Sequence, residues 1–88
     1  MNDEFLEAIL LWNTHGPSEA VTRWLQQRGL QVTPMKVGLL VTGTKEQFAA
    51  AFAVSVDLLV APFEIPVPDP LRGHVASISI PKQRQPYK

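Results

Sequence analysis

The stretch that decides the fold is VGLLVTGTKEQFAAAF (Val37–Phe52), because it passes from a strand pattern into a capped helix. Large side chains alternate with small or mixed ones over Lys36–Thr42, which predicts a β-strand. Thr44 and Gln47 have the spacing of a capping box, in which each side chain bonds the other residue's backbone N–H. We therefore predict a helix from Thr44 to about Ala53. Its expected buried residues are Phe48, Ala51 and Phe52.

A second helix is predicted at Ser18–Arg28. Pro17 suits the first helical position, and the Glu19 carboxylate suits the positive end of the helix dipole. Gly29 can adopt the left-handed conformation that ends a helix, and Leu30 can then pack back on the last turn in a Schellman arrangement. The apolar stripe that this helix should bury consists of Val21, Trp24 and Leu25.

Further segments have the composition of β-strands. Phe5–Asn13 fits both a helical stripe and a strand, and its dense apolar content favours a central strand that is buried on both faces. The remaining predicted strands are Leu30–Thr33, which should form a hairpin with Lys36–Thr42, then Val56–Val60 and His74–Ile80.

The last predicted strand should present two different faces. Its two sets of side chains are Ala76, Ile78 and Ile80 on one face and Val75, Ser77 and Ser79 on the other. Before this strand lies a segment in which prolines should exclude most regular structure, namely Pro62, Pro66, Pro68 and Pro70.

The order of these elements is β-α-β-β-α-(β)-β, which predicts an α+β fold. We expect a ferredoxin-like β-α-β-β-α-β sandwich, with a mostly antiparallel sheet and two helices on one face. A length of 88 residues suits one domain. We assign residues 1–80 to that domain and residues 81–88 to a flexible C-terminal tail.

The composition excludes several classes of partner. Eight basic residues balance eight acidic ones, so the chain lacks the positive field on which nucleic-acid binding depends. The acidic start Met1–Glu4 is unlike an export signal, and the apolar run after it is far shorter than the ~20 residues that span a bilayer. We expect neither a nucleic-acid nor a membrane partner, and a cytoplasmic location by default unless the chain belongs to a longer secreted precursor.

The glycines of Gly38–Lys45 have the spacing of a phosphate-binding loop, but the residue order argues against nucleotide binding. Thr44 precedes Lys45, whereas the motif requires lysine before serine or threonine. The intervening residues are apolar and favour a strand. We interpret this segment as a strand followed by a helix cap.

No catalytic or metal-binding constellation is evident in the sequence. His15 and His74 are far apart along the chain, cysteine is absent, and no carboxylate lies at a metal-ligand spacing from either histidine. Ser77 and Ser79 follow His74 without an orienting acid nearby, so we interpret them as solvent-facing strand residues. We expect no enzyme activity, cofactor or metal. An enzyme would require a pocket that gathers Glu7, Asp57 or Glu64 against a histidine.

The two tryptophans, Trp12 and Trp24, are interpreted as residues of the core or its edge, because large aromatic side chains at periodic positions usually bury area between a sheet and a helix.

From about Pro17 onward the chain resembles the activation propeptide of kumamolisin/sedolisin-type serine-carboxyl peptidases. The similarity is carried by helix, cap and turn residues spread over about three quarters of the chain. They are Val21, Trp24, Leu25, Gly29 and Leu30, then Gly43, Thr44, Gln47, Phe48, Ala51 and Phe52, and finally Ile65, Pro66, Pro70, Leu71, Val75 and Ile78.

This resemblance implies a ferredoxin-like domain that assists the folding of a peptidase and inhibits it. The sheet would pack on the peptidase catalytic domain, and the C-terminal segment would lie in the active-site cleft. The residues expected to bind that partner are Ile80, Pro81, Lys82, Gln83, Arg84, Gln85, Pro86, Tyr87 and Lys88. The family's longer N-terminal portion and its catalytic domain with Ser, Glu and Asp are outside this sequence.

A different class of function is also compatible with these patterns. A stand-alone ferredoxin-like module could form a homodimer through its sheet face or bind a small ligand, without any peptidase. A monomer with an exposed apolar sheet face would favour a protein partner, and a symmetric dimer that buries this face would favour the alternative.

Overall fold

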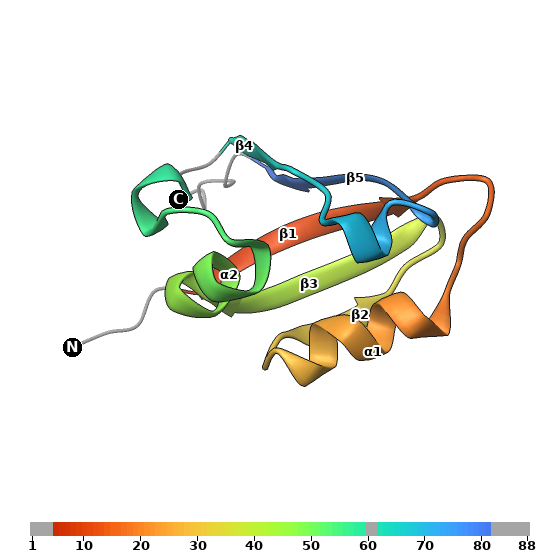
Figure 1. Cartoon of the computed structure of the whole chain (residues 1–88), viewed down its shortest axis with the longest axis horizontal. Coiled ribbons are helices and arrows are strands. Elements are labelled where there is room, and N and C mark those ends of the chain that lie inside the picture. Colours follow the sequence, from red (N-terminus) through yellow and green to blue (C-terminus); the bar gives the residue numbers. More distant parts are fainter. Residues whose placement is uncertain (1–4, 60–61, 82–88) are drawn as a thin grey trace, which may run out of the picture.

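The computed structural model describes residues 5–59 and 62–81, which form one antiparallel sheet and its covering helices (Figure 1). The strand order is β2-β3-β1-β5-β4. The strands are β1 (Phe5–Trp12), β2 (Gln31–Pro34), β3 (Gly38–Thr44), β4 (Phe63–Ile65) and β5 (Val75–Ile80), and the helices are α1 (Glu19–Gln27), α2 (Lys45–Phe52) and the short 3₁₀ helices η1 (Val56–Leu58) and η2 (Asp69–Leu71).

The fold is thus a small α+β domain with a five-stranded antiparallel sheet and two α-helices, which is compatible with a ferredoxin-like fold. Within residues 5–59 and 62–81, neither α-helix has the length and apolar content needed to cross a membrane.

Strand β1 lies at the centre of the sheet, as its apolar content predicted. It pairs with β3 on one side and with β5 on the other. The expectation that it is buried on both faces is wrong: Leu10 is fully buried, whereas the next residue, Leu11, is 37% exposed. Successive side chains of a strand point to opposite faces, and the helices cover only one of them.

Helix α1 begins at Glu19, because Ser18 still has extended dihedral angles (φ −137°, ψ 125°) and acts as the N-cap. Pro17 therefore lies before the cap and not at the predicted first helical position. The C-terminal end agrees with the prediction. Gly29 has a φ of 87°, and its N–H donates to the carbonyl of Gln26 at 3.0 Å while the Leu30 N–H donates to the carbonyl of Leu25 at 3.2 Å. These are the two hydrogen bonds of a Schellman motif.

The predicted hairpin is formed by β2 and β3, with Pro34 as the last residue of β2. Helix α2 follows β3 directly through the predicted capping box. The Gln47 N–H donates to Thr44 Oγ1 at 3.1 Å, and the Thr44 N–H donates to Gln47 Oε1 at 2.8 Å. The helix ends at Phe52, and its C-cap residue Ala53 has a left-handed φ of 56°.

The predicted strand at Val56–Val60 is wrong for the part that the structure describes, because Val56–Leu58 form the 3₁₀ helix η1. Ser55 Oγ accepts a hydrogen bond from the Asp57 N–H at 3.3 Å, and this local bond favours a turn over an extended chain. Val60 lies outside the described residues.

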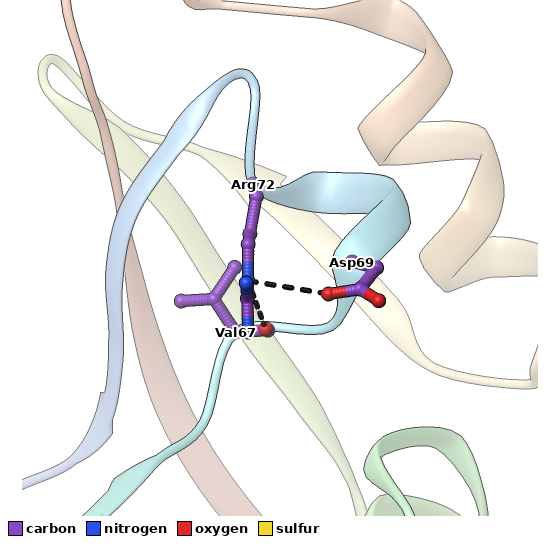
Figure 2. Close-up of polar contacts among 3 residues, drawn as sticks. All are labelled: Val67, Asp69 and Arg72. Atoms are coloured by element: carbon purple, nitrogen blue, oxygen red, sulfur yellow. Dashed lines mark hydrogen bonds and ion pairs between the residues drawn. The ribbon is translucent and has the colours of Figure 1, made fainter.

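The proline-rich segment is more regular than the sequence predicted. The short strand β4 lies between Pro62 and Pro66 at the edge of the sheet, where a missing N–H costs no ladder hydrogen bond. The 3₁₀ helix η2 follows, and Figure 2 shows the Nε of its C-cap residue Arg72 within 3.3 Å of Asp69 Oδ1 and 3.4 Å of the Val67 carbonyl oxygen. These exposed contacts tie the turn to the end of the preceding segment.

Strand β5 forms near its predicted bounds, but its alternation is interrupted. The pairing with β1 shifts between Leu11, opposite Ser77, and Trp12, opposite Val75. Ala76 is the extra residue of this bulge and is exposed, while Val75 is buried, which reverses the predicted faces of these two residues. The prediction holds from Ser77 onward.

The core is a single layer between the sheet and its helices. Both α-helices and η2 contribute buried side chains to the same cluster as the strands, so they cover the same face of the sheet (Figure 1). The cluster consists of Ala8, Leu10, Val21, Leu25, Leu30, Leu39, Val41, Phe48, Phe52, Leu59, Ile65, Leu71, Val75, Ile78 and Ile80. Trp12 and Trp24 are partly buried against it, as predicted, and Ala51 is half-buried.

Candidate functional site

Among residues 5–59 and 62–81, no helix lies over one face of the sheet, and we call this face the open face. It is defined by the pairing register, because residues that are directly opposite each other point to the same side. In the centre of the sheet, Ile9 pairs with both Leu40 and Ser79, and Leu11 pairs with Gly38 and Ser77. The open face consists of Phe5, Glu7, Ile9, Leu11, Gln31, Thr33, Gly38, Leu40, Thr42, Thr44, Glu64, Ser77 and Ser79.

The open face has an apolar centre. Phe5 is 64% exposed and Leu11 is 37% exposed, while Ile9 and Leu40 are half-buried by their neighbours on the sheet. Large apolar side chains that gather on one face, rather than occurring singly, are typical of a surface that contacts another molecule.

The charged residues of the open face all have the same sign. Its strand positions include two carboxylates, those of Glu7 and Glu64, and no lysine, arginine or histidine. Both glutamates are exposed. The remaining polar positions are threonine, serine and glutamine, which can donate or accept hydrogen bonds. The face therefore suits a partner that combines apolar and basic groups.

β3 and β1 approach each other closely where β3 begins, at one end of this face. A Cβ atom at Gly38 would collide with the backbone carbonyl of Leu10. Only glycine allows the two strands to come this near at that point. Gly38 consequently acts in the sheet and not in a phosphate-binding loop, since Gly38–Thr44 is a regular strand.

A shallow depression of about 300 Å³ lies where β4 separates from β5. Its lining residues are Glu64, Ile65, Pro66, Val67, Ala76 and Ser77. Glu64 and Ser77 also belong to the open face, so the depression adjoins that face. The bulge at Ala76 and the absence of an N–H on Pro66 end the β4–β5 ladder here.

The sheet edges are less suited to binding than the open face. The edge strands β2 and β4 span only Gln31–Pro34 and Phe63–Ile65. Pro34 ends the first, and Pro62 and Pro66 flank the second. Short edges with prolines offer few backbone groups to an added strand.

The structure describes only the first two of the residues predicted to bind a partner. Ile80 is 3% exposed and belongs to the core, so its side chain anchors the end of β5. Pro81 follows and is exposed. The remaining predicted residues, Lys82, Gln83, Arg84, Gln85, Pro86, Tyr87 and Lys88, lie outside the described residues.

The two histidines are far apart in the sequence, but the fold brings their loops together. His74 Nδ1 lies 3.1 Å from the carbonyl oxygen of His15. Asn13 joins the same loops, because its Nδ2 donates to the Gly73 carbonyl at 3.2 Å and its backbone N–H donates to the His74 carbonyl at 2.9 Å. No pattern in the sequence indicates this contact, because it depends on the pairing of β1 with β5.

This histidine cluster docks one loop against another. Among residues 5–59 and 62–81, no three acidic, histidine or cysteine side chains are grouped so that they could hold a metal ion. Of the acidic residues that an enzyme would require near a histidine, Glu7 and Glu64 lie on the open face and Asp57 lies in η1.

Comparison with known proteins gives no match to a family model, to a curated protein or to a solved structure. The resemblance to peptidase propeptides therefore stays a prediction from the sequence, and the open face is the feature of the described structure on which a functional proposal can be based.

Proposed function

We propose that this chain is a non-catalytic, ferredoxin-like binding domain that acts as the propeptide of a serine-carboxyl peptidase does, as an intramolecular chaperone and inhibitor. The topology is consistent with this fold. Without the short edge strand β4, the strand order is β2-β3-β1-β5. Helix α1 then connects β1 with β2, which lie on either side of β3, and α2 lies between β3 and β5 in the chain, which lie on either side of β1. This is the arrangement expected of a β-α-β-β-α-β chain.

The observation that carries the functional proposal is the uncovered apolar centre of the open face. Ile9, Leu11 and Leu40 form this centre and Phe5 lies at the end of β1, and no helix of the described residues covers them. A preformed apolar face with a polar rim is the usual anatomy of a protein–protein interface. In the proposed complex this face packs on the peptidase, and Pro81–Lys88 occupy the active-site cleft in extended form.

The experiment that tests the proposal is an inhibition assay with a kumamolisin-type peptidase and a chromogenic peptide substrate. We expect competitive inhibition by the intact chain. Leu11→Asp, which places a charge on the open face, should raise the inhibition constant about tenfold or more. Ala50→Asp is the matched control, because Ala50 is exposed on α2, on the helical side of the molecule.

Two results would contradict different parts of the proposal. If the intact, folded chain does not inhibit the peptidase, the propeptide function is wrong. If deletion of Pro81–Lys88 leaves the inhibition constant unchanged, the open face is sufficient and the proposed role of the C-terminal segment is wrong. Circular dichroism of each variant establishes that the fold is retained.

A homodimer through the open face is the second candidate, and it is favoured by the same apolar centre. A two-fold axis on this face would bring together two copies of the acidic pair Glu7 and Glu64, and like charges in an interface disfavour association. Sedimentation over a range of protein concentrations distinguishes a homodimer from a monomer that binds a peptidase. A dimer that Leu11→Asp dissociates would support self-association.

A further inference from the structure

The last described residues leave the sheet beside an acidic position of the open face. β5 ends at Ile80, and Ser79 pairs with Ile9 of β1. Continued by two residues in this antiparallel register, the same pairing places Pro81 next to Glu7. Pro81 has no N–H with which to extend the ladder, so the described chain ends beside the open face.

The charge and composition of residues 82–88 complement the open face. Lys82, Arg84 and Lys88 are basic, and KQRQPYK (Lys82–Lys88) includes no acidic residue. The strand positions of the open face include only carboxylates as charged groups. Tyr87 adds one aromatic ring, which matches the apolar centre at Ile9 and Leu40.

The segment is also long enough to cross this face. Seven residues in extended form reach about 23 Å. Neighbouring strands are about 4.8 Å apart, so the three steps from β5 across β1 and β3 to β2 span about 14 Å.

We propose that, in the free protein, residues 82–88 bind across the open face of their own chain. The basic side chains lie beside Glu7 and Glu64, and Tyr87 covers the apolar centre. Tethering gives the segment an effective concentration of about millimolar, so the exposed ion pairs and the burial of the Tyr87 ring together need to supply only a millimolar affinity. A partner that uses the open face must then displace this segment, which makes the segment an internal competitor. The inference concerns the isolated chain and does not depend on the proposed function.

Paramagnetic broadening in the full-length chain tests this inference. The sequence has no cysteine, so Gln85→Cys provides a unique attachment site for a nitroxide. We expect the label to broaden the backbone amide signals of Ile9, Leu11 and Leu40 strongly. The amides of α1, on the covered side, should keep at least about half of their intensity, because the effect falls steeply with distance.

Matched variants separate charge recognition from mere proximity. Glu7→Gln with Glu64→Gln should reduce the broadening at Leu40 at least about twofold, because the complementary charges are removed. Glu46→Gln, an exposed glutamate on α2, should leave it unchanged. Raising the salt concentration to about 1 M should also reduce the broadening at Leu40, as Glu7→Gln with Glu64→Gln does, because salt screens exposed ion pairs.

Three results would overturn the inference. The first is equal broadening of the open face and of α1. The second is broadening at Leu40 that persists after both glutamates are neutralised. The third is broadening of an unlabelled, ¹⁵N-enriched chain mixed with spin-labelled chain, which would show that a second copy is the occupant.

Discussion

Single residues decide how closely the strands of this protein approach one another. Gly38, the first residue of β3, lies so close to β1 that a Cβ atom there would overlap the Leu10 carbonyl oxygen. Gly73, in the turn before β5, has no atom within 4 Å of the position that a Cβ would take. The two glycines therefore differ: Gly38 is required for the close approach of two strands, whereas the position of Gly73 has room for a side chain.

Gly38→Ala should destabilise the fold by about 1–3 kcal/mol, because β3 must move away from β1 to make room for the methyl group. Gly73→Ala is the matched control and should change the free energy of unfolding by less than about 0.5 kcal/mol. Urea unfolding of both variants measures the difference. Equal stability of the two variants would contradict the close strand approach.

At the scale of the element, the two helices are stabilised at different ends. Helix α2 has a complete capping box at its N-terminus, formed by Thr44 and Gln47. Helix α1 has Ser18 as its N-cap without a side-chain hydrogen bond, and is instead closed at its C-terminus by the Schellman motif at Gly29. Near that end, the Arg28 guanidinium lies 3.8 Å from the centre of the Trp24 ring.

Thr44→Ala should destabilise the protein by about 1 kcal/mol, because the Gln47 N–H loses its acceptor. Ser18→Ala removes an N-cap hydroxyl that makes no capping hydrogen bond, so its effect should be smaller than about 0.5 kcal/mol. Thermal unfolding of the two variants is the measurement. A cost for Ser18→Ala as large as that for Thr44→Ala would contradict the assigned caps.

At the scale of the whole molecule, the sheet separates two environments. The side covered by α1, α2 and η2 forms the entire buried cluster of the described residues. The other side leaves an apolar centre exposed, and its charges are acidic. A domain built as one covered layer has an uncovered sheet face available for a partner.

Adjacent leucines in the central strand test this one-sided architecture. Leu10→Ala should destabilise the protein by about 2–5 kcal/mol, because Leu10 is fully buried in the core. Leu11→Ala, one residue further on the open face, should cost less than about 1 kcal/mol in the free protein, since its side chain is already partly in water. Chemical unfolding compares them. Comparable losses would mean that both faces are covered.

The sequence by itself determined the elements whose signals are local. The capping box at Thr44, the left-handed Gly29 and the alternation after Ser77 each depend on neighbours a few residues away, and all three agree with the structure. Where a local bond or the edge position of a strand outweighed composition, the prediction failed, as at η1 and β4. The sequence predicted that the helices lie on one face of the sheet, which leaves the other face open, but it did not indicate which residues form that open face.

Only the tertiary structure decided which apolar side chains are buried. Leu10 and Leu11 are adjacent residues of the same type, but only Leu10 lies on the face that the helices cover. The same is true of the bulge at Ala76 and of the contact between the His15 and His74 loops, both of which arise where β1 meets β5. These features depend on register between distant strands, and a one-residue shift of register moves every side chain to the opposite face.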